Sequence, residues 1–160
     1  MELLTVTPYR RSLVPDPELL PGVRSEVASE LCAWGVGSAV PDVTLVLTEL
    51  LANVHLHASG QVADVLVRPE MSPVAGRPEM CSILVSVSDR SHKLPHLCAP
   101  DPFETHGRGM LLVDALSSHW ETVLTATGKT IRCHVPVPVH VKQGGRALHP
   151  PVTQRTRPSR

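Results

Sequence analysis

The chain has 160 residues, 42% of them hydrophobic, which is the size and composition of one globular domain with a substantial core. Its 15 basic and 15 acidic residues give a formal net charge of zero, so the balance indicates neither direct nucleic-acid binding nor a strong field for an acidic partner. With one Phe, one Tyr and two Trp the core must be aliphatic, and the aromatic platforms that stack single-stranded nucleic acids are missing.

The N-terminal part predicts a strand and a helix. Residues 2–9 contain Leu-Thr-Val-Thr and predict the strand, which Pro15 and Pro17 separate from the next element. Residues 18–34 predict the helix, and Gly35 ends it. Its apolar side chains recur at helical spacing: Leu20, Val23, Val27, Leu31 and Trp34.

Residues 41–59 predict a longer amphipathic helix. Pro41 and Asp42 fit a helix start, and neither Gly nor Pro follows before Gly60. At about 100° per residue, the apolar side chains gather on one arc: Val43, Val46, Leu47, Leu50, Leu51, Val54 and Ala58.

A polar stripe follows the edge of this arc. Glu49, Asn53 and His57 are spaced four residues apart and drift toward the apolar side, which places His57 beside Leu50. A buried polar group without a partner costs roughly 1–3 kcal/mol, so the stripe indicates water, a partner segment or a ligand in a cleft at the helix edge. Solvated flank residues and a satisfied core histidine explain the same pattern equally well.

Two strands are predicted next, over residues 61–68 and residues 81–89, with a loose loop over residues 71–78 between them. Ile83, Val85 and Val87 of the second strand point to one face, and Asp89 continues that face. Asp89 is either the first loop residue in water or a ligand-binding group at a cleft.

Residues 90–106 contain three Pro and three His without hydrophobic periodicity, and they predict a long loop. Gly107, Arg108 and Gly109 close it and lead into a short apolar helix from Met110 to Leu116. Unpaired amide groups at such a helix start suit an anion such as phosphate, although a single Gly-x-Gly is a weak signal.

The C-terminal part predicts a hairpin and a tail. Residues 119–125 and 129–137 read as strands joined by Ala126-Thr127-Gly128. From Pro138 on, Pro, Gly, Arg and His dominate, and no acidic residue follows Glu121. We therefore expect one domain over residues 1–137 and a basic, disordered tail over residues 138–160.

The cysteines and the hydropathy bear on localisation. Cys32, Cys81, Cys98 and Cys133 form no Cys-x-x-Cys pair and follow no signal peptide, so we expect buried free thiols in a reducing compartment. No apolar run approaches the ~18 to 20 residues that span a membrane. We expect a cytoplasmic protein that contacts neither membrane nor nucleic acid directly.

Taken in order, the chain offers a helix with Glu-x-x-x-Asn, a strand ending in Asp, a long loop, a Gly-rich turn entering a helix and a Gly-x-Thr hairpin. This order resembles the histidine-kinase-like (GHKL) ATPase superfamily, which includes gyrase, mismatch-repair ATPases and sensor histidine kinases. It is most similar to the small anti-sigma-factor serine/threonine kinases of high-GC Gram-positive bacteria. The resemblance covers roughly residues 3–137 and implies a Bergerat-type α/β fold, an α+β two-layer sandwich with a mixed, mostly antiparallel sheet and three helices on one face.

The resemblance also assigns roles to residues. TELLANVHLHA resembles the N box, where Glu49 would be the general base and Asn53 would bind Mg²⁺. VSDRSHKLP resembles the G1 box, so Asp89 would accept a hydrogen bond from the adenine amino group. HGRGMLLVDALSSHW resembles the G2 box, and GKTI the last box, where Thr130 would support Asp89. The implied ATP-binding residues are Asn53, Asp89, Pro95, Gly107, Arg108, Gly109, Met110 and Thr130, while His57 keeps a structural role.

The activity implied is that of a protein kinase that uses ATP and Mg²⁺ to phosphorylate an anti-sigma-factor antagonist. A sigma factor is the alternative partner, and the resemblance implies a homodimer. The G1 box departs from the pattern, because Ser91 and Lys93 stand where many members have glycine, and a backbone without those glycines is less free to wrap a nucleotide.

Two further interpretations remain open. The departure in the G1 box favours a catalytically weak or inactive module that regulates transcription or development by protein contacts alone. A zinc site has plausible spacing, although nine histidines make chance clusters frequent. Its ligands would be His92, His96, Cys98 and His106.

Overall fold

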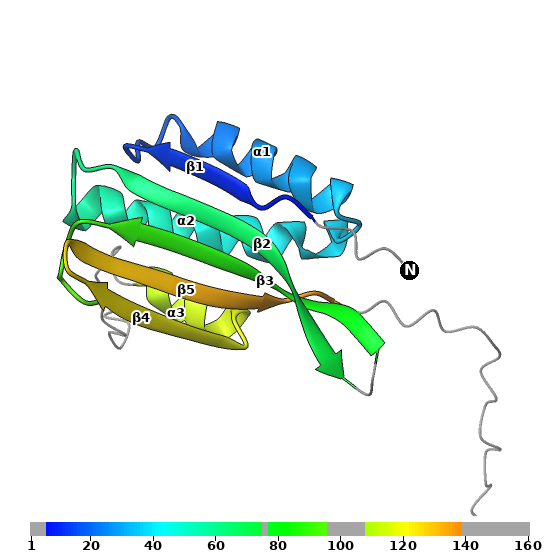
Figure 1. The fold of residues 1–160 in the computed structure, drawn as a ribbon. Helices are drawn as coiled ribbons and strands as arrows, with labels where there is room; N and C mark the ends of the chain where they lie inside the picture. Colours follow the sequence, from blue (N-terminus) through cyan, green and yellow to red (C-terminus); the bar gives the residue numbers. More distant parts are fainter. Residues whose placement is uncertain (1–5, 75–76, 96–107, 139–160) are drawn as a thin grey trace, which may run out of the picture.

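An antiparallel sheet of five strands forms one of two layers, in the order β1-β2-β3-β5-β4 (Figure 1). The computed structural model describes residues 6–74, 77–95 and 108–138. The strands are β1 (Tyr9–Leu13), β2 (Ala63–Val74), β3 (Arg77–Asp89), β4 (His119–Thr125) and β5 (Gly128–Pro136). Every pair of neighbouring strands in the described sheet is antiparallel.

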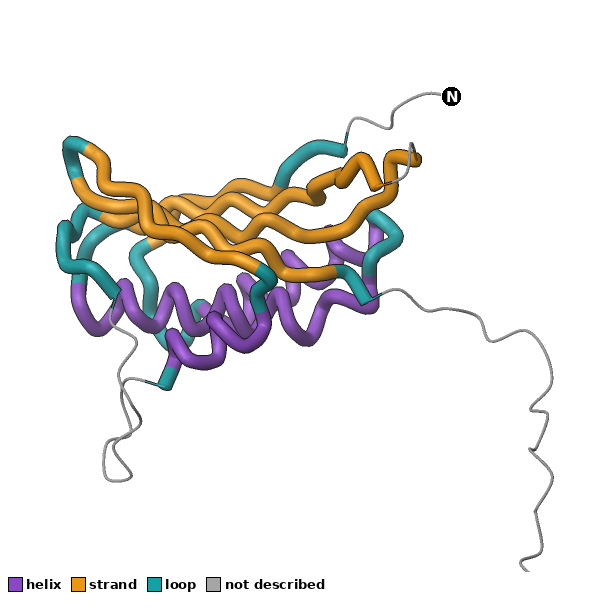
Figure 2. Tube along the Cα trace, turned by 90° about the horizontal axis from the view of Figure 1, so that it is seen from below, coloured by secondary structure: helices purple, strands orange, loops and turns teal. Residues whose placement is uncertain are grey.

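The second layer consists of helices on one face of this sheet (Figure 2). They are α1 (Leu20–Ala33), α2 (Val40–His57) and α3 (Gly109–Leu116), and a short 3-10 helix, η1 (Gly37–Ala39), leads into α2. The other face of the sheet carries no helix of the described chain. The predicted α+β two-layer sandwich with three helices on one face is therefore confirmed.

The core lies between the layers and is aliphatic, as the composition predicts. α1 contributes Val23, Val27 and Leu31, which are 0–1% exposed, and six side chains of α2 are buried. The sheet contributes the face of β3 that carries Ile83, Val85 and Val87. Since burying a side chain of this size contributes about 1.5–3 kcal/mol, α2 is a main source of the fold's stability.

The first strand lies further along the chain than predicted. It runs from Tyr9 to Leu13, while residues 1–5 of the predicted strand lie outside the described residues. Tyr9 donates a hydrogen bond of 2.7 Å to Glu26 of α1, and Arg11 pairs with the same carboxylate at 2.5 Å. Burial and the Glu26 carboxylate raise the pKa of Tyr9 to about 12. Hydrophobic periodicity does not predict this strand, because the positions of β1 that face the helices are largely polar.

The hairpin of β2 and β3 is longer than predicted. Both strands continue into the predicted loop over residues 71–78, with a bulge between Glu70 and Met71, and the arm extends beyond the rest of the sheet (Figure 1). β1 covers β2 only as far as Val67, so the outer part of β2 is an edge strand. Proline is tolerated on an edge, which is why Pro69 and Pro73 do not end the strand.

By length and composition alone, the segment Gly37–His57 is long and apolar enough to cross a membrane. The expectation that no apolar run approaches this length is therefore wrong. In the fold, the apolar side chains of this segment serve the core between the sheet and the neighbouring helices. Its hydropathy is therefore explained without a membrane.

The cysteines depart partly from the prediction. Cys133 is buried, and its burial raises the pKa of the thiol to about 12, which makes it unreactive. Cys32 is a free thiol as predicted, but it is exposed on α1. The side chain of Cys81, and Cys98 altogether, lie outside the described part of the chain.

Candidate functional site

Glu49 of α2 reaches the start of α3. A side-chain carbon placed on Gly109 would lie 2.5 Å from Glu49 Oε2, so the carboxylate rests against the first residue of that helix. The contact needs glycine, because any side chain would push Glu49 away. The structure thus brings together Glu49 and the start of α3, which are far apart in the sequence.

The charge of Glu49 is poorly compensated. Its side chain is half-buried, and burial raises the pKa of the carboxyl group above its usual value of 4.5. No described residue forms an ion pair with it. A half-buried carboxylate without a counterion is a candidate general base, since its affinity for a proton is raised.

The start of α3 offers amide groups beside this carboxylate. The residue before the helix, Arg108, is exposed and makes no side-chain cap, so no side chain of the described residues satisfies the first N–H groups. Met110, predicted to contact ATP, has its side chain buried in the core. Only its backbone is therefore available for an anion at the helix start.

Asn53 lies one turn beyond Glu49 on α2. It is half-buried, and its side chain makes no hydrogen bond to any residue of the described ranges. An amide oxygen is a ligand type that Mg²⁺ accepts together with nucleotide phosphates. His57, one turn further on, is exposed, so its predicted place beside Leu50 in the apolar arc is wrong.

Asp89 ends β3 as part of a buried ion pair. Lys129 Nζ lies 3.0 Å from Asp89 Oδ1 and 2.9 Å from Oδ2. The amide of Ser91 donates to Oδ1 at 2.7 Å, and Lys129 also donates to the carbonyl oxygen of Ser91 at 3.2 Å. Asp89 is therefore buried and is not the solvated loop residue that was the alternative.

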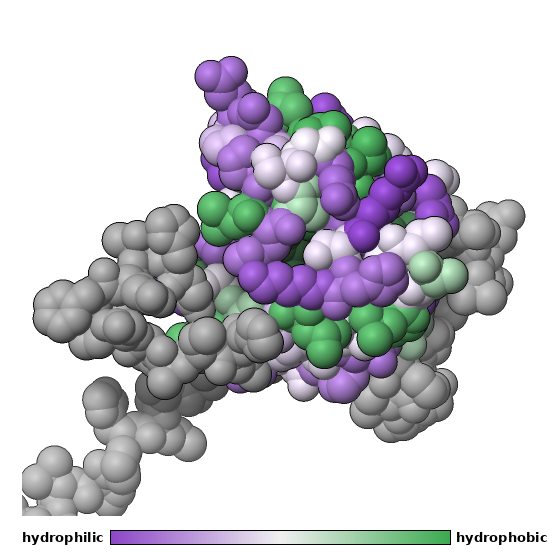
Figure 3. Space-filling view, turned by 90° about the vertical axis from the view of Figure 1, so that its left-hand side faces the viewer, coloured by the Kyte–Doolittle hydropathy of each residue, from purple (hydrophilic) through white to green (hydrophobic). Residues whose placement is uncertain are grey.

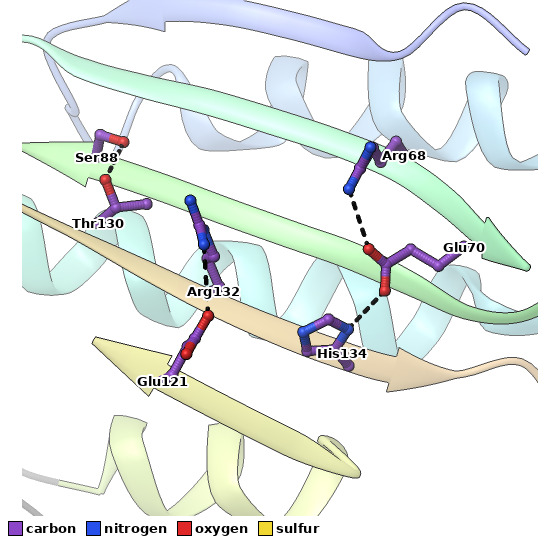
Figure 4. Close-up of polar contacts among 7 residues, drawn as sticks. All are labelled: Arg68, Glu70, Ser88, Glu121, Thr130, Arg132 and His134. Carbon is purple, nitrogen blue, oxygen red and sulfur yellow. Dashed lines mark hydrogen bonds and ion pairs between the residues drawn. The ribbon is translucent and has the colours of Figure 1, made fainter. Parts of the chain in front are cut away.

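The resemblance implies that Thr130 supports Asp89, but the two side chains lie on opposite faces of the sheet. The hydroxyl of Thr130 is 2.8 Å from that of Ser88, on the face of the sheet opposite the helices (Figure 4). Successive residues of a strand point to opposite faces, and the register pairs Asp89 with Lys129. Lys129 is thus the partner of Asp89, which the sequence analysis does not predict, and the alternation of side chains along the strand is the signal that could have found it.

The open face of the sheet holds a separate polar hollow of about 530 Å³. Within it Glu70 contacts both Arg68 and His134, and Arg132 pairs with Glu121 (Figure 4). It lies on the other side of the sheet from Glu49 and Asn53, so it does not belong to the site described here.

The remaining predicted residues are only partly described. Pro95 is half-buried at the end of a described range, whereas Gly107 and three of the four proposed zinc ligands, His96, Cys98 and His106, lie outside these ranges. Within the described ranges no group of three or more potential metal-ligating side chains occurs. The zinc prediction thus stays untested.

Figure 3 shows the end of the molecule at which β3 ends and β5 begins. Hydrophilic side chains prevail on the described surface there, with smaller hydrophobic areas between them. A polar ligand is therefore compatible with this end of the fold.

Comparison with known proteins agrees with this geometry. Residues 13–134, more than half of the chain, match the histidine kinase-like ATPase domain. The match includes Glu49, Asn53, Asp89 and the start of α3. No curated protein matches the chain. The chain therefore belongs to the histidine kinase-like ATPase family and is an ATP-binding, kinase-like module.

Proposed function

We propose that the protein is a serine/threonine protein kinase and anti-sigma factor that phosphorylates an anti-sigma-factor antagonist. One observation carries the proposal. Glu49 is half-buried, has a raised pKa, lacks a counterion among the described residues and rests against the start of α3, one turn from Asn53. This arrangement supports a general base, a metal ligand and an anion site at one place.

The phosphate end of the site fits MgATP. Asn53 would hold Mg²⁺ through its amide oxygen, and the uncapped amides of α3 would hold phosphate oxygens, with the exposed Arg108 guanidinium beside them. When bound, MgATP supplies the γ-phosphoryl group. Phosphoryl transfer needs mainly positioning and electrostatic stabilisation, so these few groups suffice.

In the transfer step Glu49 accepts the proton. A serine or threonine hydroxyl of the antagonist would lie against the carboxylate, give its proton to Glu49 and receive the phosphoryl group on the same oxygen, while the bond from the γ-phosphorus to the bridging oxygen breaks and ADP leaves. Burial raises the pKa of Glu49, which strengthens it as a base.

The part of the site that would face the nucleobase favours a second candidate function. Asp89 is engaged by Lys129, and Ser91 and Lys93 replace the glycines typical of the G1 box. A module that binds nucleotide weakly and regulates transcription or development through protein contacts alone is therefore the alternative. The resemblance further supports a cytoplasmic homodimer and, as an alternative partner, a sigma factor.

The test is transfer of label from γ-labelled ATP with Mg²⁺ to purified candidate antagonists. We expect Glu49→Gln to lower the rate by about 10²–10⁴-fold, the usual contribution of a general base. Glu121→Gln, which removes an exposed acid on the open face of the sheet, should leave the rate unchanged. The wild-type rate should fall as pH decreases through the pKa of Glu49, above 4.5, because protonation removes the base.

Absence of labelled antagonist with every candidate, together with wild-type behaviour of Glu49→Gln in cells, would rule out the kinase. Nucleotide binding without transfer would favour the regulatory module.

A further inference from the structure

The part of the proposed site that would face the nucleobase contains a lysine, Lys129, paired with the carboxylate of Asp89. Asp89 and Lys129 face each other in the register of β3 and β5, on the helix side of the sheet. Their side chains keep only 4% and 7% of their exposure. The buried rows of Val87 on β3 and Ile131 on β5 thus end in an ion pair that is almost closed to water.

This ion pair uses most of the acceptor capacity of Asp89. An ionised carboxylate offers about four acceptor positions. Lys129 Nζ contacts both oxygens, at 3.0 and 2.9 Å, and the amide of Ser91 takes a further position on Oδ1. A base amino group that approaches Asp89 therefore has to compete with a charged donor already in place.

The backbone holds the lysine there. A side-chain carbon on Gly128 would collide with the carbonyl oxygen of Asp89, so β5 begins in direct contact with the end of β3. Lys129 follows immediately, and its ammonium group is anchored a second time by the carbonyl oxygen of Ser91, at 3.2 Å. The pair is thus built into the hairpin and is not a chance contact of a mobile surface lysine.

We propose that Lys129 lowers the selectivity of this site between adenine and guanine nucleotides, because it occupies the place on Asp89 that an adenine amino group would take. The inference rests on the proposed nucleotide site. The nucleotide is then held mainly through its phosphates, by Asn53 and the start of α3. Guanine carries a carbonyl oxygen where adenine carries the amino group, so a site that does not use this group distinguishes the two bases poorly.

The test compares ATP and GTP by isothermal titration with Mg²⁺ on wild type and Lys129→Thr. Wild type should bind both within about threefold, whereas Lys129→Thr should prefer ATP by about tenfold or more, because Asp89 then accepts the amino group. Arg132→Met is the matched control, since it removes a cation from β5 on the open face, where it pairs with Glu121. It should keep the wild-type ratio.

A second variant allows for the buried carboxylate that Lys129→Thr leaves without a counterion. Asp89→Asn combined with Lys129→Thr removes both charges, and its amide can either accept from adenine or donate to guanine, so it should bind both nucleotides within about threefold. Thermal unfolding without ligand confirms that each variant is folded.

The outcomes separate this inference from the kinase proposal. An ATP preference of about tenfold in wild type, a wild-type ratio in folded Lys129→Thr, or the same ATP preference in the double variant as in Lys129→Thr overturns the inference and leaves the kinase standing. ATP binding by Lys129→Thr but not by wild type contradicts the kinase and also overturns the inference, because wild type is expected to bind both nucleotides through their phosphates. No nucleotide binding by any of these proteins overturns both.

Discussion

Two glycines set how closely the segments of the site approach one another, and they do so differently. Gly109 faces the carboxylate of Glu49, which is the flexible end of a side chain. Gly128 faces the backbone of Asp89 and Arg90, which cannot move without disturbing β3. The first glycine therefore leaves room for the Glu49 carboxylate, and the second leaves room for the backbone at the Asp89–Lys129 pair.

Replacing each glycine by alanine should separate these roles. Gly109→Ala should remain folded but displace Glu49, and a displacement of about 1 Å can cost about 10²-fold in rate. Gly128→Ala should lower the free energy of unfolding by about 1–3 kcal/mol or more, as overpacking does. Urea unfolding and the label-transfer assay measure the two effects.

Gly22 provides the control for this pair. It lies in the first turns of α1 with nothing within 4 Å of an added side-chain carbon, so Gly22→Ala should be neutral or stabilising by up to about 1 kcal/mol. Equal losses of stability in Gly109→Ala and Gly128→Ala would contradict the distinction.

At the scale of elements, α2 joins the core to the site. Its inner face carries the six buried side chains, and its edge carries Glu49 and Asn53. Leu45 and Leu56 on the outer face are 38% and 50% exposed. The position of the polar pair relative to α3 therefore depends on how firmly the inner face packs.

A matched pair of leucines tests this dependence. Leu47 is 1% exposed, so Leu47→Ala should lower the free energy of unfolding by about 2–5 kcal/mol, through lost burial and a cavity. Leu45→Ala removes the same atoms from the outer face and should change it by about 0.5 kcal/mol or less. Urea unfolding followed by far-UV circular dichroism measures both, and similar losses would show that α2 is not packed as described.

At the scale of the molecule, much of the fold was predictable because hydrophobic periodicity reports burial. The prediction for β4 is confirmed residue for residue, and α2 and α3 begin and end within two residues of their predicted limits. β1 escaped prediction because Arg11 points toward α1, where it pairs with Glu26. The outer part of the β2–β3 hairpin was not predicted, because its prolines are typical of a loop although an edge strand tolerates them.

The site was predictable only in part, for a physical reason. The spacing of Glu49 and Asn53 on one helix is a local property, so the sequence shows it directly. The contact of Glu49 with Gly109 and the pairing of Asp89 with Lys129 depend on packing and on hairpin register. Taking Thr130 as the partner of Asp89 shifted that register by one residue, which moves a side chain to the other face.

The most direct test of the account is isothermal titration of ATP, with Mg²⁺ and with EDTA, into wild type, Asn53→Ala and Thr48→Ala. Thr48 serves as the control because it lies on the same helix, with its hydroxyl bound to the carbonyl oxygen of Thr44. We expect Mg²⁺-dependent binding to wild type and Thr48→Ala, and a loss of about tenfold or more, ~1.4 kcal/mol, in Asn53→Ala. ATP binding that is unaffected by both EDTA and Asn53→Ala would contradict the assignment of α2 and the start of α3 as the nucleotide site.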